Sequence, residues 1–304
     1  DWRVREENAF HTMEAGPVPD AGVAYVDSKG NNYLESVDAQ GRVAFYDVIN
    51  PGTVGPIEED LDNDGRLDLP YIDGNGNIKI VDKTGGPTKF VDSSKVKTGT
   101  TRIGVGDLDD DGTPAVIFRG TSSRISKKEV GGSVRTIKYT DGNSEVDLKG
   151  HAVAGVADFD GKGSPELVYV ESTDNSELAT FDPDEKNGKG KQRVLNEKPG
   201  SPNAIGSPGD YDGDGEQEVP YVTQGDELAL IDNGKKVTVL TGSGTPKPAT
   251  SPMGRLDVIG DATPEVIFRG ADNQIYYVTA DGIVEPLLDR YGRELPTKSG
   301  PGVT

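Results

Sequence analysis

The chain has 304 residues, of which 33% are hydrophobic, and a formal net charge of −20. This acidic balance disfavours nucleic-acid binding, which needs a positive field. The absence of cysteine excludes disulfides, thiolate metal sites and cysteine nucleophiles. No apolar run has the length of a membrane span, and no signal peptide opens the sequence. The 41 glycines and 20 prolines instead favour many short strands joined by turns.

The first predicted element is the segment 1–16, which starts DWRVREENAF. A short repeat follows it, beginning at Tyr25 with YVDSKGNNY, and has room for about three strands. We therefore expect the segment 1–16 to supply a missing outer strand or to latch a ring of repeats shut. The Tyr25 repeat keeps only Asp27 and Gly30 of the acidic pattern described next, so no metal is expected there.

An acidic nonapeptide recurs along the rest of the chain. It reads DLDNDGRLD from Asp60, DLDDDGTPA from Asp107, DFDGKGSPE from Asp158 and DYDGDGEQE from Asp210. A copy that lacks some of the shared residues, DVIGDATPE, starts at Asp257, and we call it the worn copy. With the Tyr25 copy, the starts are separated by 35, 47, 51, 52 and 47 residues. Six copies at this period occupy nearly the whole chain, so we predict one domain, 1–304, instead of separate domains.

A strand pattern follows each loop. An aliphatic residue stands nine residues after the start, and in five of six copies an aromatic residue follows two positions later. A spacing of two puts both side chains on one face of a β-strand. We interpret the rings as packing between neighbouring sheets and not as a ligand platform. The pairs are Leu69/Tyr71, Val116/Phe118, Leu167/Tyr169, Val219/Tyr221 and Val266/Phe268, with Leu34/Ser36 as the exception.

Further apolar alternation follows in most copies, as in NIKIVD (77–82), VRTIKYT (134–140) and ELALID (227–232). Each unit therefore contains about four short antiparallel strands, the make-up of a propeller blade. One blade cannot bury both of its faces alone, so the blades must close in a ring. The predicted fold is all-β, a single β-propeller of four-stranded antiparallel blades, with six blades as the expected count and seven as the alternative.

The acidic loops predict metal binding. Carboxylates held this close raise each other's pKa values and destabilise the fold unless a cation neutralises them. Carboxylate oxygens are hard ligands suited to Ca²⁺. The residues at loop positions 1, 3 and 5 project toward the ion, position 7 offers its carbonyl, and position 9 closes the shell. Glycine at position 6 permits a left-handed turn. The alternative is a hydrated acidic turn without metal.

An EF-hand shares the DxDxDG opening of these loops. It also requires a bidentate glutamate at the twelfth loop position and a helix on each side. The twelfth residues here are Tyr71, Phe118, Tyr169 and Tyr221, each inside a strand pattern. The EF-hand interpretation is therefore rejected.

The unit D-x-D-x-D-G-x-x-D/E, followed by a short hydrophobic strand and repeated along the chain, resembles the FG-GAP/VCBS repeat. That repeat is the calcium-binding blade of integrin-α-type propellers and of many prokaryotic surface proteins. The resemblance covers residues 20 to 290, although the Phe-Gly and Gly-Ala-Pro signatures of the family are weak or absent. It implies Ca²⁺ in the matched loops and a propeller that serves in recognition or adhesion.

Carried over position by position, the resemblance implies two complete calcium loops. The first would use Asp60, Asp62, Asp64, the carbonyl of Arg66, and Asp68. The second would use Asp210, Asp212, Asp214, the carbonyl of Glu216, and Glu218.

Two more loops would bring the number of sites to four. One offers Asp107, Asp109, Asp111 and the carbonyl of Thr113. Its ninth position is Ala115 and not an acid, so water would complete the shell. The other offers Asp158, Asp160, the carbonyl of Ser164, and Glu166. Its fifth position is Lys162, whose ammonium group could stand in for the ion. The Asp257 copy has Ile259 and Ala262 in place of an acid and a glycine, so no metal is expected there.

Two functional classes remain open. The first is a non-enzymatic, calcium-stabilised propeller that binds an extracellular protein or glycan through its loops, at the cell surface or in a secreted, virion or surface assembly. The alternative is a carbohydrate-active enzyme, such as a polysaccharide lyase on a calcium-binding propeller. A lyase needs a base poised beside calcium in a funnel. The sequence identifies no such partner for His11 or His151, so we expect binding and not catalysis.

Two arginines, Arg119 and Arg269, occupy matching VIFRG strands. They could bind an anionic ligand. The more ordinary interpretation, which we expect, is an end-of-strand residue with a packed stem and a solvated head.

Overall fold

The computed structural model describes residues 23–26, 33–37, 43–47, 51–55, 59–81, 87–100, 102–141, 144–172, 176–183, 190–195, 197–201, 204–233, 237–242, 245–248, 252–289 and 291–295. The predicted outer strand or latch, 1–16, lies outside these residues, as do Asp27 and Gly30 of the Tyr25 repeat.

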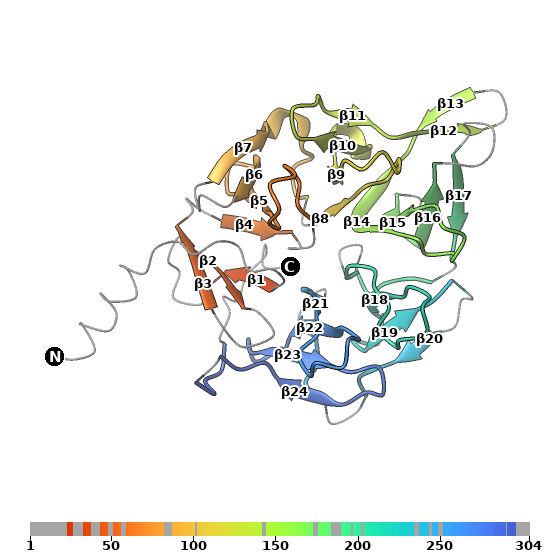
Figure 1. Ribbon diagram of the computed structural model, residues 1–304. Coiled ribbons are helices and arrows are strands. Elements are labelled where there is room, and N and C mark those ends of the chain that lie inside the picture. Colours follow the sequence, from red (N-terminus) through yellow and green to blue (C-terminus); the bar gives the residue numbers. More distant parts are fainter. Residues whose placement is uncertain are drawn as a thin grey trace.

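Antiparallel sheets, each made of strands consecutive in sequence, follow one another around a central axis (Figure 1). Four of them have four strands. They are β4–β7 (Pro51–Val54, Leu69–Asp73, Ile78–Val81, Pro87–Val91), β8–β11 (Ile103–Gly106, Ala115–Arg119, Ile125–Glu129, Arg135–Thr136), β14–β17 (Gly150–Ala157, Glu166–Glu171, Leu178–Asp182, Lys191–Val194) and β21–β24 (Gly254–Leu256, Glu265–Arg269, Ile275–Val278, Val284–Pro286).

A fifth blade has three strands, β18 (Val219–Val222), β19 (Leu228–Ile231) and β20 (Val237–Val239). The segment 204–209 runs along its inner edge, because Ile205 pairs with Tyr221 and Gly209 pairs with Glu218 in isolated bridges. This segment takes the place of a regular innermost strand.

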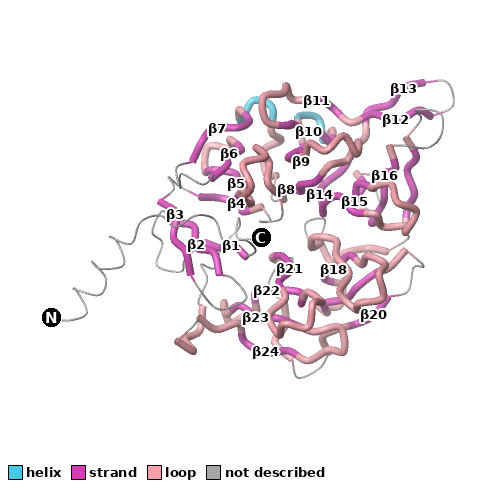
Figure 2. The backbone as a smooth tube through the Cα atoms, viewed as in Figure 1, coloured by secondary structure: helices cyan, strands magenta, loops and turns pink. Residues whose placement is uncertain are grey.

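The first repeat forms a three-stranded sheet, β1 (Val23–Val26), β2 (Tyr33–Val37) and β3 (Val43–Asp47). It lies between β4–β7 and β21–β24, and β1 contacts both β4 and β21 (Figure 2). The predicted all-β propeller of small antiparallel blades is thus confirmed, but the predicted six or seven four-stranded blades are wrong. Five blades have a described core, and the first repeat, with only 35 residues before the next start, contributes three strands.

In the second blade, β8–β11, the outermost strand ends earlier than the sequence pattern predicted. The run 134–140 is split at Ile137 into β11 and a separate strand, β12 (Lys138–Asp141), which pairs with β13 (Ser144–Asp147) in a two-stranded hairpin. At the split, Ile137 is buried, its N–H donates to the carbonyl of Ile125 at 2.9 Å, and its carbonyl accepts from the N–H of Leu148 at 2.8 Å. Short 3-10 turns, η1 (Ser93–Lys95) and η2 (Thr121–Ser123), lie in the connections of the first two blades.

The predicted aromatic residues pack between blades. Tyr71, Phe118, Tyr169, Tyr221 and Phe268 are each at most 1% exposed. Phe118 lies in one apolar cluster with Leu61, Ile72 and Ile78 of the preceding blade. Burying such a side chain contributes about 1.5–3 kcal/mol. The interpretation of these rings as inter-sheet packing is confirmed.

All five described acidic loops connect the innermost strand or segment of a blade to its second strand. Since the blades repeat in one orientation around the axis, these loops share one face of the ring, which we call the loop face. The turns between second and third strands lie on the opposite face. Within the described residues, no helix is long and apolar enough to cross a membrane.

Candidate metal sites

The acidic loops are held by the same backbone hydrogen bonds. In the Asp60 loop, the carboxylate of Asp60 accepts hydrogen bonds from the N–H groups of Asp64 (3.0 Å) and Gly65 (2.7 Å). The first-position aspartates of the other loops, Asp107, Asp158, Asp210 and Asp257, likewise accept a hydrogen bond from the sixth-position N–H. The loop shape is therefore encoded by the first carboxylate and the backbone.

The sixth position adopts the left-handed backbone that the sequence predicted. The φ angles are 91° at Gly65, 84° at Gly112, 89° at Gly163 and 89° at Gly215. Ala262, in the worn loop, has the same conformation, with φ of 74°. Because this loop keeps the shape without a third-position acid or a sixth-position glycine, the shape does not depend on a complete set of metal ligands.

The ninth-position carboxylate is buried in the loops that have one. Asp68, Glu166 and Glu218 are 3%, 3% and 4% exposed. Each accepts a hydrogen bond from the N–H of the second loop residue, Leu61 (2.9 Å), Phe159 (2.8 Å) and Tyr211 (2.8 Å) respectively.

Burial and neighbouring acids make these carboxyls easy to protonate. Desolvation, followed by the charge of Asp62, raises the pKa of Asp68 to about 6. Desolvation, followed by the charge of Asp160, raises the pKa of Glu166 to about 7. Desolvation, joined by the charges of the loop aspartates, raises the pKa of Glu218 to about 7 against the backbone hydrogen bond that lowers it. A cation would reverse this repulsion.

In four loops the acids converge closely enough to hold a metal ion. One oxygen from each of three carboxylates lies within 4.8 Å of the others. The groups are Asp60, Asp62 and Asp68; Asp107, Asp109 and Asp111; Asp158, Asp160 and Glu166; and Asp210, Asp212 and Glu218.

The remaining predicted ligands have other positions. Asp64 and Asp214 do not belong to these groups, and Asp214 accepts a hydrogen bond from the N–H of Glu216 at 2.8 Å. The seventh-position residues Arg66, Thr113, Ser164 and Glu216 lie in the turn that precedes the second strand. Coordination through their carbonyls stays a prediction.

The Asp107 loop already has a cation beside it. The ammonium group of Lys127, on β10, lies 2.6 Å from the carboxylate of Asp109 and 3.1 Å from that of Glu129. Glu129 pairs across the strands with Ala115, the residue that replaces the ninth-position acid. The missing carboxylate is thus present on the next strand, where it is paired with a lysine.

The Asp158 loop also contains a lysine contact. The ammonium group of Lys162 forms an ion pair with Asp160, the third-position acid. The lysine side chain is 76% exposed, so it can be displaced without opening the core. This contact agrees with the expected role of Lys162 as a stand-in for the ion.

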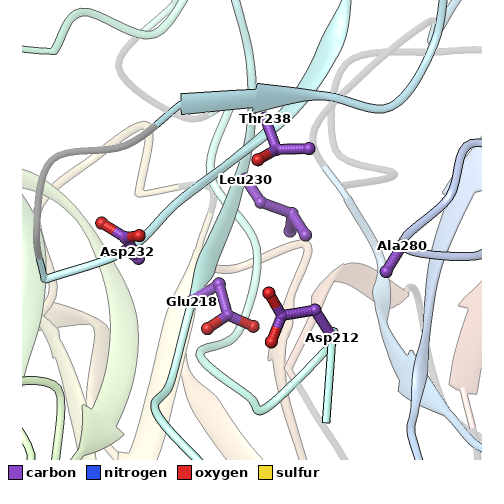
Figure 3. A pocket seen from close by; sticks show the side chains of 6 residues that line it. All are labelled: Asp212, Glu218, Leu230, Asp232, Thr238 and Ala280. Carbon is purple, nitrogen blue, oxygen red and sulfur yellow. The ribbon is translucent and has the colours of Figure 1, made fainter. Parts of the chain in front are cut away.

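The Asp210 loop opens into a small pocket of about 200 Å³ between the blade of β18–β20 and the blade of β21–β24. In Figure 3 the carboxylates of Asp212 and Glu218 face each other, and Asp232 lies beside them at the end of β19. Leu230, Thr238 and Ala280 complete the lining.

Asp232 belongs to a set of acids that the sequence analysis missed. Asp182 has the equivalent position in the preceding blade, at the end of the third strand, and its charge acts on Glu166. Glu129 has this position in the second blade, where it pairs with Ala115. The sequence contains a signal for these acids, because an aspartate ends the third strand at residue 182 and directly follows the third strand at residue 232. Finding it required the register between the second and third strands.

No family model matches the chain, and no curated protein matches its sequence. Solved structures do match its fold. The crystal structure of BBS1N in complex with ARL6DN has a TM-score of 0.50 at 15% identity, over 93% of this chain and 91% of that chain. The chain is a β-propeller. The structure of SapL1 lectin in complex with alpha methyl fucoside also has a TM-score of 0.50, at 10% identity, over 90% of this propeller and 98% of that chain. At these identities the likeness shows the fold alone.

Proposed function

We propose that this propeller is a non-enzymatic, calcium-stabilised recognition module of the FG-GAP/VCBS kind, which acts outside the cell on a protein or glycan. The observation that carries the proposal is the convergence of three carboxylates in each of four loops on one face of the ring. Grouping charges of one sign in this way lowers the stability of the folded protein, because the charges repel one another, and a bound cation removes that repulsion.

The Asp60 and Asp210 loops fit Ca²⁺ best. Each brings together the first, third and ninth acids and buries the ninth carboxylate, and neither has the fifth-position lysine of the Asp158 loop. Calcium takes six to eight oxygen ligands in a flexible geometry, so loop carbonyls and water would complete the shell. Bound there, calcium would neutralise the loop and tie the inner edge of the blade to its second strand.

The Asp107 and Asp158 loops would bind more weakly. Lys127 and Lys162 already neutralise the third-position acids of these loops, and a calcium ion would have to displace them. We therefore propose two calcium sites that fill first and a total of up to four.

An extracellular location would suit these loops even at low calcium affinity, because extracellular modules bind calcium with dissociation constants of about 10⁻⁴–10⁻³ M. It also suits a chain without cysteine, for which calcium would take the stabilising role that disulfides have in many secreted proteins. The SapL1 structure, described as a lectin complex with alpha methyl fucoside, is compatible with a glycan as the ligand of this fold.

Calorimetric titration of Ca²⁺ into metal-stripped protein tests the proposal, with thermal unfolding followed on the same samples. We expect two to four equivalents to bind and each site to stabilise the fold by about 2.7 kcal/mol at a hundredfold excess over its dissociation constant. Asp62→Ala and Asp212→Ala should each remove one site. Asp261→Ala, in the worn loop, is the matched control and should remove none. The absence of both binding and stabilisation would identify the loops as hydrated acidic turns.

A further inference from the structure

Basic side chains gather on the face of the ring opposite to the loop face. Three segments meet there, 95–97, 119–124 and 149–151. Val96 pairs with Gly120 and Arg124 pairs with Lys149 in isolated bridges, and the N–H of Lys97 donates to the carbonyl of Arg119 at 3.0 Å. We call this surface the basic patch and define it by Lys95, Lys97, Arg119, Arg124, Lys149 and His151.

The three segments contain no acidic residue, although the chain carries a net charge of −20. The contrast is sharpest in the turn between the second and third strands. In this blade the turn reads GTSSR (120–124). In each of the other four blades an acid lies in the turn or ends the strand before it, namely Asp73, Glu177, Asp226 and Asp272. The second blade therefore lacks the negative charge that its neighbours place here.

Within the described residues, one member of the patch, Arg124, is neutralised by an ion pair. Asp147 forms an ion pair with Arg124 at 2.7 Å, and Asp92 forms one with Lys89 at 2.9 Å. Glu171, which pairs across the strands with Gly150, is buried and accepts a hydrogen bond from Gln192. Within the described residues, Lys95, Lys97 and Lys149 form no ion pair.

Arg119 lies at the centre of the patch. Its guanidinium group is partly buried and donates to the hydroxyl of Ser123 at 2.9 Å, while its buried Nε has no hydrogen-bond partner among the described residues. Burial, followed by the charge of Arg119, lowers the pKa of His151. A partly buried cation without a carboxylate is costly, so the site calls for an external anion.

The backbone of the turn is also unusual. Ser122 and Ser123 have φ angles of 59° and 60°, so two consecutive residues other than glycine are left-handed. Among the described residues of the corresponding turns in the other blades, a single residue of each turn is left-handed, namely Gly76, Ser176, Asp226 or Asn273. Strained backbone of this kind clusters at binding sites, because the surroundings must hold it in place. Here it directs the hydroxyl of Ser123 toward Arg119.

We propose that the basic patch binds the carboxylate groups of an acidic polysaccharide, with Arg119 as the central contact. This inference rests on the proposed recognition function and names the ligand class and the face that it uses. A guanidinium fork matches a carboxylate in geometry, and the serine hydroxyls of the turn can bond to sugar hydroxyls. Lys97 and Lys149 flank this position and would contact carboxylates of neighbouring sugars. The net charge of −20 opposes a densely charged polymer such as DNA more than a chain with spaced carboxylates.

Binding of hyaluronan oligosaccharides, measured by calorimetry at saturating Ca²⁺, tests the proposal. Neutral dextran, chondroitin sulfate and single-stranded DNA serve as comparison ligands. We expect hyaluronan to bind and dextran not to bind, with an affinity that falls as salt is raised. Arg119→Gln and Lys97→Glu should each weaken binding at least tenfold without changing the melting temperature in Ca²⁺ by more than a few degrees.

Lys247→Glu is the matched control. Lys247 precedes Pro248, which pairs with Gly270 in the last blade as Val96 pairs with Gly120 in the second, so this change reverses a charge at the place that corresponds to Lys95. It should leave hyaluronan binding unchanged. If hyaluronan did not bind, or bound Arg119→Gln as tightly as the wild type, the assignment of the basic patch as its binding site would be wrong. The calcium titration would still support the proposed function in that case. Tighter binding of DNA or of the sulfated chain would overturn the carboxylate assignment.

Discussion

The backbone N–H of Leu61 donates a 2.9 Å hydrogen bond to the buried carboxylate of Asp68, seven residues further along the chain. Three other loops contain the same bond, including the worn one, where Val258 donates to Glu265 at 2.6 Å. The bond joins the start of the loop to the start of the second strand in every case. The fold thus holds the ninth carboxylate in place even where the other acids are missing, and a metal would meet a site that is already formed.

This arrangement predicts a pH dependence that calcium should abolish. The pKa values of Glu166 and Glu218, about 7 in the folded protein, lie above the ordinary glutamate value of about 4.3. Between these values the folded state binds more protons than the unfolded state, so stability falls as pH rises through this window. Metal-stripped protein should therefore melt at a higher temperature at pH 5 than at pH 7.5.

Saturating Ca²⁺ should raise the melting temperature at pH 7.5 much more than at pH 5, because calcium binds only the ionised carboxylates. Glu218→Gln is the control, since it removes one of the titrating groups and should flatten the decline in metal-stripped protein. A melting temperature that rises steadily from pH 5 to pH 7.5 without calcium would contradict the raised pKa values.

Ala262 predicts a gain in stability from a single substitution. It adopts φ of 74°, a conformation that costs a residue with a Cβ about 1–2 kcal/mol and glycine almost nothing. Ala262→Gly should therefore stabilise the protein by about 1 kcal/mol, after the greater flexibility of glycine in the unfolded chain is subtracted. Chemical denaturation measures the change.

The reverse substitution supplies the control. Gly112 has the same loop position, and a Cβ added there would meet no atom within 4 Å. Gly112→Ala should thus destabilise by a similar amount through its backbone conformation alone. Equal stabilities for all three proteins would show that the left-handed turn relaxes at no cost.

Much of this structure could be predicted from the sequence because its signals are local. The aspartate loop, the left-handed sixth residue and the buried aromatic two positions into the strand all lie within about a dozen residues of one another. Lys127 could not be predicted as the partner of Asp109, because that contact depends on the register between β9 and β10. The blade count depends in a similar way on how the short first repeat closes the ring.

The two VIFRG strands show the same limit. Arg269 is 4% exposed, whereas Arg119 is half-buried in the basic patch. Identical pentapeptides therefore give one packed arginine and one candidate ligand contact.

Two buried tyrosines at equivalent positions should respond differently to loss of their hydroxyl groups. The hydroxyl of Tyr71 is buried and has no hydrogen-bond partner among the described residues, and phenylalanine has this position in two other blades, at Phe118 and Phe268. The hydroxyl of Tyr221 donates to Glu197 at 3.1 Å. Tyr71→Phe should be neutral or stabilising, while Tyr221→Phe should destabilise by about 1 kcal/mol. Urea denaturation of the two variants decides the matter, and an equal loss in both would show that Tyr71 gains a water or another partner.

Lys162→Asp should convert the Asp158 loop into a third complete calcium loop. The substitution removes the ammonium group that pairs with Asp160 and places a carboxylate at the fifth position, as in the Asp60 and Asp210 loops. Its direct effect without metal should be a lower melting temperature, because a fourth acid then faces Asp158, Asp160 and Glu166. With Ca²⁺ the variant should recover, and calorimetry should show one more tight site or a tighter third site.

Lys162→Gln separates the two effects of that change, since it removes the cation without adding an acid. It should fall between the wild type and Lys162→Asp in calcium affinity. If neither variant changed the affinity or the number of calcium ions bound, the Asp158 loop would not be a metal site, and its acids would serve only to shape the turn into β15.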